Sequence, residues 1–385
     1  MSSRLCIALL LVAGVARGEE TPSPAPAAAE RVARFAFQTL GGRRSLLERG
    51  GNFYFPGPEN ELWIAPKPAG GEIPRETPAP IGKLKLKGVP NLFEWVGDGL
   101  LCIATGLHLA FVDVADPKSP RIVREVAVAD TETRGVGDFR RWRGGLLLAA
   151  RRRGLVGLDL EDRTRVKVNA ELELPGMAQG LDFDGERIAV ATGTGIALVA
   201  PTLGGLKLEH FIDTFRDAGV VRLLGKRLVF ASKEYLVFLD ITDPKSPTVI
   251  AEISTVDPFF NTWHVDLRVK DGRVYTASTE GGVYVYDWRD AQAPRTLLQY
   301  SFWANQHAVT PEKKLQYLHS IGFQGSAADL DPFIAKAENL HVAAVGLHVE
   351  GDKVYAVDWK GQLWCLAIET GAKPAVRCLM RPPAK

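Results

Sequence analysis

Residues 111–126 read FVDVADPKSPRIVREV, and residues 237–253 repeat the pattern as VFLDITDPKSPTVIAEI. A weaker third copy, VYVYDWRDAQAPRTL, lies at 283–297. Each copy is an alternating apolar strand, an Asp/Pro turn and a second alternating strand, which is typical of a β-hairpin. A matching hairpin precedes each copy, in VGDGLLCIAT, LLGKRLVFAS and VKDGRVYTAS. The repeating unit is therefore four strands in about forty residues.

The aspartate at the end of the third strand sets the register of this repeat. Asp113, Asp159, Asp240 and Asp287 hold that place, and Ala200 and Ala367 fill it in two further units. The last interval spans two periods, which predicts a degenerate unit between Asp287 and Ala367, in KLQYLHSIGF followed by AADLDPFIAKAE. Seven units thus run from about residue 91 to 380.

A four-stranded unit of this size cannot bury both faces of its sheet alone, so radial stacking is expected. The sequence predicts an all-β fold, a seven-bladed β-propeller of four-stranded blades, over residues 91–380. Residues 31–90 are predicted to be an N-terminal extension or a partial blade. The stretch NFYFPGPENELWIAP at 52–66 leaves open an eighth blade.

The strand ending in V-D or L-D followed by D-P-x-x-P resembles the LVIVD repeat of exported bacterial propellers. It is seen as FVDVADPKSP, FLDITDPKSP and, weakened, VYDWRDAQAP. The resemblance covers most of residues 91–300 and implies a propeller at the cell surface or in the periplasm. It implies little about activity, because a fold does not fix a function.

The N-terminus predicts export. Arg4 precedes a short apolar run at 5–15 (LCIALLLVAGV), and Ala16-Arg17-Gly18 has the small residues of a cleavage site. The run is shorter than the about 20 residues of a membrane span, and no later segment approaches that length. We expect residues 1–18 to be a signal peptide and residues 19–30 a Pro/Ala-rich linker. The mature chain is then periplasmic or extracellular, with no transmembrane segment.

The composition is that of a globular protein, with 46% hydrophobic and 24% charged residues among 385. The formal net charge is +2, and cleavage after residue 18 removes two arginines and no acidic residue. The mature chain is then close to neutral, which argues against nucleic acid as a partner.

Cleavage also removes Cys6 and leaves three cysteines. Cys102, in the apolar run GLLCIA, is expected to be a buried small side chain. Cys365 and Cys378 flank the expected turn at 370–374, so a disulfide between them is plausible in an oxidising compartment.

Two similar stretches, FFNTWH at 259–264 and FWANQH at 302–307, form the first candidate site. Both are expected in connectors at one mouth of the propeller channel, with a weaker copy, ENLH, at 338–341. The candidate binding residues are Asn261, Trp263, His264, Trp303, Asn305 and His307.

Three interpretations of this pair remain open: a metal site, a small-molecule or peptide site at the channel mouth, and packing between blades. Neutral imidazoles bind transition metals, so His264, His307 and His341 are candidate ligands for a divalent metal, with Asp266 nearby. Alternatively, the aromatic residues pack between blades while Asn and His hydrogen-bond to connector backbone.

An arginine cluster forms the second candidate site, in RRWRGG at 140–145 and RRRG at 151–154. Neighbouring strands could gather these side chains, from Arg140 to Arg153, into a cationic patch for an anionic surface. Its candidate residues are Arg140, Arg141, Trp142, Arg151 and Arg152. The alternative is a solvated blade surface on which these arginines pair with nearby acidic residues.

Because the scaffold is well marked and no catalytic motif stands out, the favoured function is an exported, non-catalytic propeller without a cofactor. It would present a rigid surface to a protein, peptide or cell-envelope partner. The alternatives are a metal-dependent hydrolase or oxidase at the channel mouth, using His264 and His307, and an anionic-surface binder. The sequence leaves the oligomeric state open.

Overall fold

The chain divides into two compact units, Met1–Thr39 and Leu40–Lys385, and all residues described below belong to the second. The computed structural model describes residues 44–68, 79–106, 108–128, 135–161, 166–214, 217–232, 235–255, 263–278, 282–290, 293–300, 344–358, 361–368 and 375–380. Across these ranges the regular structure is almost entirely β, with one short 3-10 helix, η1 (Pro58–Asn60). No helix within them is long and apolar enough to cross a membrane.

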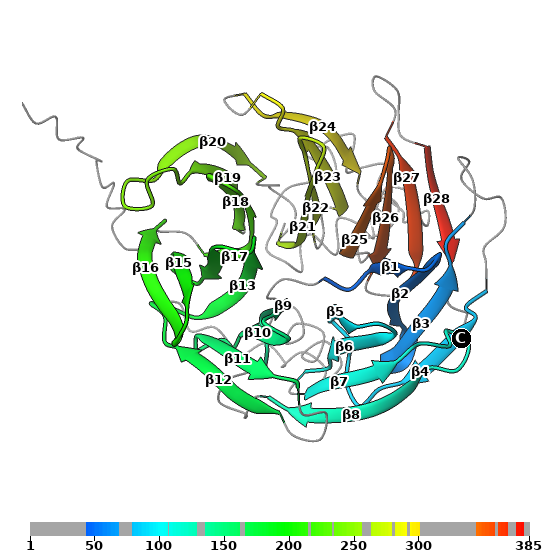
Figure 1. The fold of residues 1–385 in the computed structure, drawn as a ribbon. Helices are drawn as coiled ribbons and strands as arrows, with labels where there is room; N and C mark the ends of the chain where they lie inside the picture. Colours follow the sequence, from blue (N-terminus) through cyan, green and yellow to red (C-terminus); the bar gives the residue numbers. More distant parts are fainter. Residues whose placement is uncertain are drawn as a thin grey trace, which may run out of the picture. The chain divides into compact units, whose positions relative to one another are not determined.

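Twenty-eight described strands form seven antiparallel four-stranded sheets, which we number as blades in chain order (Figure 1). Blade 1 holds β1 (Leu47–Arg49), β2 (Asn52–Gly57), β3 (Glu61–Pro66) and β4 (Gly82–Lys85). Blade 2 holds β5 (Leu92–Gly97), β6 (Leu100–Ala104), β7 (His108–Asp113) and β8 (Arg121–Ala127), and blade 3 holds β9 (Asp138–Trp142), β10 (Gly145–Ala149), β11 (Leu155–Asp159) and β12 (Lys167–Leu172).

The remaining four blades follow the same order. Blade 4 holds β13 (Ala178–Phe183), β14 (Ile188–Thr192), β15 (Gly195–Thr202) and β16 (Gly205–Asp213), and blade 5 holds β17 (Ala218–Leu224), β18 (Arg227–Ser232), β19 (Tyr235–Asp240) and β20 (Thr248–Ser254). Blade 6 holds β21 (His264–Lys270), β22 (Arg273–Ser278), β23 (Gly282–Asp287) and β24 (Arg295–Tyr300), and blade 7 holds β25 (Ala344–Glu350), β26 (Lys353–Asp358), β27 (Leu363–Ala367) and β28 (Ala375–Met380).

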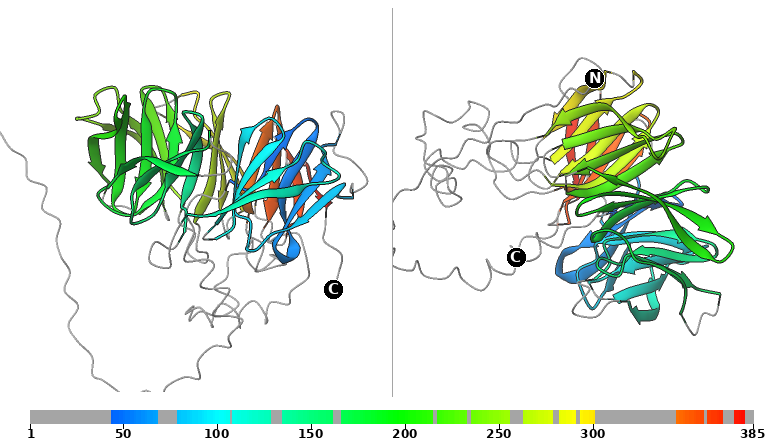
Figure 2. Two further views of the ribbon diagram at one scale, coloured as in Figure 1. Left: turned by 60° about the horizontal axis from the view of Figure 1, so that its bottom comes forward. Right: turned by 90° about the vertical axis from the view of Figure 1, so that its left-hand side faces the viewer.

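The blades form a closed ring, with the first strand of each blade nearest the centre (Figures 1 and 2). Seven apolar clusters join them, one for each pair of neighbours. The last cluster closes the ring, since Phe53 and Trp63 of blade 1 pack with Tyr355 and Val357 of blade 7. The predicted all-β, seven-bladed propeller is confirmed.

The residues that form the seven blades differ from those predicted from the sequence. Residues 47–85, where an extension or partial blade was expected, form the complete sheet of blade 1. Blades 6 and 7 share one core, in which Tyr275 and Val285 lie with Leu347 and Trp364. A unit between Asp287 and Ala367 therefore does not separate them in the ring, and the residues proposed for it lie outside the described ranges.

The strand-end aspartates play one geometric role, as their register predicts. Asp113, Asp159, Asp240 and Asp287 each accept a hydrogen bond from the backbone N–H two residues later, at 2.8–3.1 Å. The two DPKSP turns are also alike: Asp116 and Asp243 accept from the N–H of Lys118 and Lys245, each at 3.0 Å. These Asx turns fix the link between the third and fourth strands.

The outer edge of the ring is interrupted in a regular way. In blades 2 to 7 the pairing of the third and fourth strands shifts by one residue, which is a β-bulge. Bulges twist an edge strand and make it a poorer template for pairing with another chain. The outer strands are therefore poor sites for pairing with a strand of another chain. The two faces of the ring and the spaces between blades at its rim are better suited to selective contacts.

Candidate functional site

The inner strands hold a network of buried charges. Asp182, Arg222, Arg268 and His348 are each the fifth residue of their strand, in β13, β17, β21 and β25. In all four strands the pairing with the second strand shifts just after the first residue, so these four positions correspond. Four successive blades thus carry a polar or charged side chain at one level of the ring.

Arg44 ties the first three blades together. Its Nη2 lies 2.7 Å from the Glu94 carboxylate of blade 2 and donates to the Phe139 carbonyl of blade 3 at 2.5 Å. Its own carbonyl accepts from the N–H of Phe93 at 2.9 Å. The side chain is 9% exposed, so these contacts form largely away from water.

Carboxylates link each inner strand to the next. Asp138 pairs with Arg140 at 2.7 Å and accepts from the N–H of Leu181 at 3.3 Å. Asp182 accepts from the N–H of Leu223 at 2.9 Å and lies 3.5 Å from Arg140. Blades 3, 4 and 5 are therefore joined at the centre of the ring by charge-assisted hydrogen bonds, the stronger kind.

Asp266 is the corresponding link between blades 5, 6 and 7. Its side chain is fully buried, with one oxygen 3.5 Å from Arg222 and the other 3.1 Å from Arg268. The second oxygen also accepts from the N–H of Leu347 at 3.0 Å. One carboxylate therefore forms ion pairs with two guanidinium groups and accepts a hydrogen bond from one backbone amide.

The charges of this network, which we call the central belt, balance. Its four arginines face four carboxylates, and its members are Arg44, Glu94, Asp138, Arg140, Asp182, Arg222, Asp266 and Arg268. Burial, and then the charge of Arg140, lower the pKa of Arg222 to about 10, which Asp182 and Asp266 oppose. For Arg140 the opposite holds: burial is outweighed by the carboxylates of Asp138 and Asp182, so its pKa is raised. Arg140 and Asp266 were among the residues singled out from the sequence, but the belt itself was not predicted.

His264 is packed between blades and not presented at a channel mouth. It is 4% exposed, with Nδ1 3.1 Å from the Thr276 hydroxyl and Nε2 3.1 Å from the Thr255 hydroxyl. The Tyr284 ring meets it edge-on at 5.9 Å. Hydroxyl groups engage both ring nitrogens in this arrangement, and the assignment of this imidazole as a metal ligand stays a prediction.

The other residues of the two aromatic stretches give less information. Trp263 is half-buried immediately before β21. Asn261, Trp303, Asn305, His307 and His341 lie outside the described ranges. No group of three or more His, Cys, Asp or Glu side chains suited to a metal occurs among the residues that are described.

The burial of His264 predicts a stability that depends on pH. Burial lowers its pKa to about 4, below the 6.5 of an unfolded histidine. Between these values the unfolded chain binds the proton and the native chain does not, so stability falls as the pH falls through this window. His348, whose pKa is lowered to about 4 by burial and then by Arg268, adds to the effect.

We expect urea unfolding to show a loss of ~2–3 kcal/mol between pH 6.5 and 4 from His264. His264→Gln should flatten part of this slope. An identical pH dependence in the His264→Gln variant and the wild type would contradict this assignment.

The arginine cluster is not one surface patch. Arg140 and Arg151 are buried, whereas Arg141 and Arg152 are exposed. Trp142 is also buried, with the Arg143 guanidinium 4.8 Å from the centre of its ring. The patch was mispredicted because neighbours along a strand alternate between environments, and the inner position of β9 directs Arg140 into the central belt.

The predicted disulfide is also wrong. Cys365 is a free, buried thiol. In the pairing of β27 with β28 it stands opposite Arg377, and Cys378 stands opposite Trp364. Because successive residues of a strand alternate between the faces, this register does not bring residues 365 and 378 together. Cys102 is buried and free, as its apolar context predicts.

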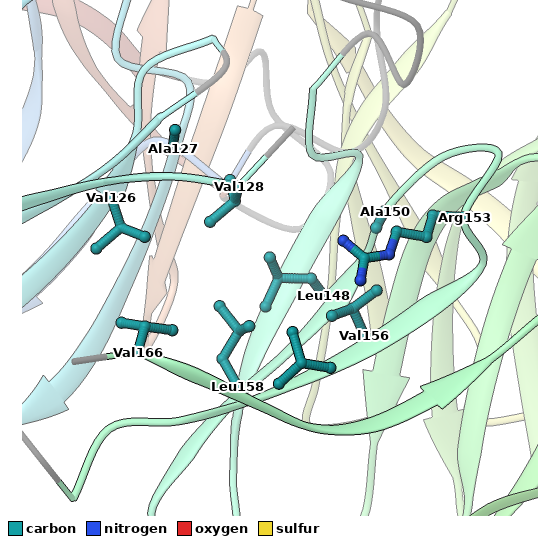
Figure 3. Close-up of a pocket in the computed structure, with 10 residues that line it drawn as sticks. Val126, Ala127, Val128, Leu148, Ala150, Arg153, Val156, Leu158 and Val166 are labelled. Atoms are coloured by element: carbon teal, nitrogen blue, oxygen red, sulfur yellow. The ribbon is translucent and has the colours of Figure 1, made fainter. Parts of the chain in front are cut away.

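A cavity opens at the rim between blades 2 and 3 (Figure 3). We call it the rim groove; its volume is about 460 Å³, and nine aliphatic side chains and Arg153 line it. The aliphatic side chains include Val126 and Val128 from the end of blade 2 and Val156 and Leu158 from β11. Ligand sites are commonly of this size. The rim groove was not found from the sequence.

Comparison with known proteins defines the fold. No family model and no curated protein matches this chain. Similar solved structures include the computationally designed Ika8 protein, at 10% identity and a TM-score of 0.52, where the match covers 88% of this chain and 87% of that one. The N-terminal domain of Nup159 matches at 12% identity and 0.52, over 86% and 90% of the two chains.

A chain from a complex of S. cerevisiae Dbp5 bound to Nup159, Gle1, IP6 and ADP matches at 11% identity and a TM-score of 0.52, over 85% and 89% of the two chains. At these identities the likeness concerns the fold alone. This chain is a β-propeller.

Proposed function

We propose that this chain is an exported, non-catalytic β-propeller that presents a rigid surface to a protein, peptide or cell-envelope partner, without a resident cofactor. The central belt carries this proposal. Its charged groups pair with one another and form hydrogen bonds with backbone groups of neighbouring blades, so they hold the blades together. A propeller made rigid in this way offers its faces and rim as preorganised binding surfaces, which lowers the entropic cost of association.

Two further observations support this function. The N-terminal sequence has the pattern of a secretory signal, and the turns resemble those of exported LVIVD-repeat propellers. Among proteins of similar fold, Nup159 is found bound to Dbp5, another protein. That likeness says nothing about which partner this chain would take.

The test begins with the full gene expressed with its own leader in a bacterial host. N-terminal sequencing of the protein from the periplasmic fraction should begin at Glu19. The mature protein should then capture a defined envelope component in a saturable way, and the His264→Ala/His307→Ala double variant should capture it equally well. Retention of the protein in the cytoplasm, or stoichiometric metal and turnover lost in the double variant, would overturn the proposal.

A further inference from the structure

The rim groove has a buried floor and half-buried sides. Its floor is formed by buried residues of blade 3, among them Leu148 and Leu158, which are 1% and 4% exposed. Its sides rise to Val126 and Val166, which are half-buried. Apolar surface that stays partly in contact with water gains free energy when an apolar group covers it.

The repeat itself shows what this space can hold. Asp159 of blade 3 corresponds to Asp287 of blade 6, so Val156 and Leu158 take the places of Tyr284 and Tyr286. In blade 6 the two tyrosine rings are parallel, 6.2 Å apart, and fill the interface with blade 5. In blade 3 the smaller side chains face blade 2 from the same strand positions. The rim groove therefore lies at strand positions that correspond to those where phenol rings pack at another interface of the same ring.

A polar group lies at the corresponding place beside both strands, in blade 6 and in blade 3. In blade 6, Gln299 stands opposite Tyr284 and donates a hydrogen bond to its hydroxyl at 3.2 Å. In blade 3, the residue opposite Val156 is Glu171, whose carboxylate pairs with the Arg153 guanidinium. Both side chains of this pair are a little under half exposed. A ring that enters the rim groove thus meets a hydroxyl-binding group where Tyr284 meets one.

We propose that the rim groove is a docking site for a tyrosine side chain of a protein partner, with the ring against Val156 and Leu158 and the hydroxyl at the Arg153–Glu171 pair. The inference rests on the proposed function as an interaction scaffold and deepens it by naming the chemistry of the contact. Tyrosine in a desolvated pocket is a common anchor of protein interfaces, because it buries a large rigid surface and keeps a polar tip.

The binding test uses a defined probe, the capped peptide acetyl-Ser-Gly-Ser-Tyr-Ser-Gly-Ser-amide, and the mature protein with labelled Val and Leu methyl groups. Titration should shift the methyl signals of Val126, Val128 and Leu158, with a Kd on the order of 1 mM for a single side chain. The methyl signal of Val249, on the rim of blade 5, should stay in place. The same peptide with Leu in place of Tyr should shift them less, because it lacks the hydroxyl.

Stronger shifts with decanoate than with the tyrosine peptide would show an aliphatic ligand site instead, and would overturn the proposal. So would the absence of any shift at these methyl groups with the tyrosine peptide at several times the expected Kd.

A filling variant, Val156→Tyr/Leu158→Tyr, copies the solution of blade 6 into blade 3. It should raise the thermal midpoint and weaken binding of the tyrosine peptide by about tenfold or more. Val249→Tyr, which adds a ring at an exposed rim position, should change neither. If the filling variant fails to fold, Glu171→Ala serves instead and should reduce the preference for Tyr over Leu peptides.

The two proposals fail in different ways. If the wild type and the filling variant capture the same envelope partner equally, the rim groove is not the docking site, while the scaffold function stands. If the wild type captures no partner at all, the scaffold function fails, whatever the peptide does.

Discussion

Arg44→Met should lower the free energy of unfolding by ~3–5 kcal/mol, the range for breaking a buried ion pair by removing one partner. The guanidinium is 9% exposed and lies 2.7 Å from Glu94. It also donates to the carbonyl of Phe139, 95 residues away along the chain. Removing it leaves the Glu94 carboxylate and a buried carbonyl without this donor, and blade 1 without its link to blade 3.

The matched control is Arg49→Met, five residues further along the same inner segment. The Arg49 side chain is 43% exposed, donates to the Gly97 carbonyl and lies 4.5 Å from the centre of the Trp95 ring. An exposed arginine of this kind is worth up to ~1 kcal/mol. Denaturant unfolding of both variants should separate them clearly, and equal losses would show that Arg44 does not hold the ring.

The size of this effect follows from how the ring closes. Each described blade takes its four strands from one continuous stretch of the chain, so no strand is exchanged between the first and last blades. The ends of the ring meet through packing and through Ser45, whose hydroxyl donates to the Val345 carbonyl at 2.9 Å. Arg44 and Ser45 together reach blades 7, 2 and 3, so this short segment closes the ring.

The fold could be predicted because its signals are local. A turn such as DPKSP determines its own geometry through the aspartate two residues before a backbone N–H, and Asp116 and Asp243 make the same hydrogen bond. Blade 1 was missed as a complete blade for the same reason: its third strand ends in Ala65-Pro66, without the aspartate that marks blades 2, 3, 5 and 6.

The central belt could be predicted only in part. A signal exists in the sequence, since GLDF, VVRL, DLRV and GLHV each place a polar side chain inside an apolar inner strand. An aligned charge in such a strand indicates a partner in the core, because an unpaired buried charge is costly. Which arginine meets which carboxylate depends on the closing of the ring, and no local pattern shows that Arg44 reaches Phe139.

The rim groove lay beyond prediction for a related reason. Val156 and Leu158 are ordinary core residues when they are compared only with their sequence neighbours. Their small size matters only against Tyr284 and Tyr286 at the corresponding positions, and only because the end of blade 2 faces them with Val126 and Val128. A cavity is set by both sides of an interface, and the sequence shows each side separately.

Asp266→Ala should be the most destabilising single change in blades 5 to 7, with a loss of ~3–5 kcal/mol. The carboxylate is fully buried and lies within 3.5 Å of two guanidinium groups. Its removal takes away the carboxylate that pairs with both Arg222 and Arg268 and removes the acceptor of the Leu347 N–H. Asp266→Asn should cost less, since the amide oxygen can still accept from that N–H.

The decisive comparison is the triple variant Asp266→Ala/Arg222→Met/Arg268→Met, which removes the charges together. Replacing a buried ionic triad with apolar residues is often neutral or stabilising, so the triple variant should recover most of the stability that Asp266→Ala loses. Such recovery, measured by denaturant unfolding, would show that the cost lies in the unpaired arginines and that Asp266 acts through charge compensation. A triple variant no more stable than Asp266→Ala would instead place the cost in the lost hydrogen bond to Leu347 and in packing at the joint of blades 6 and 7.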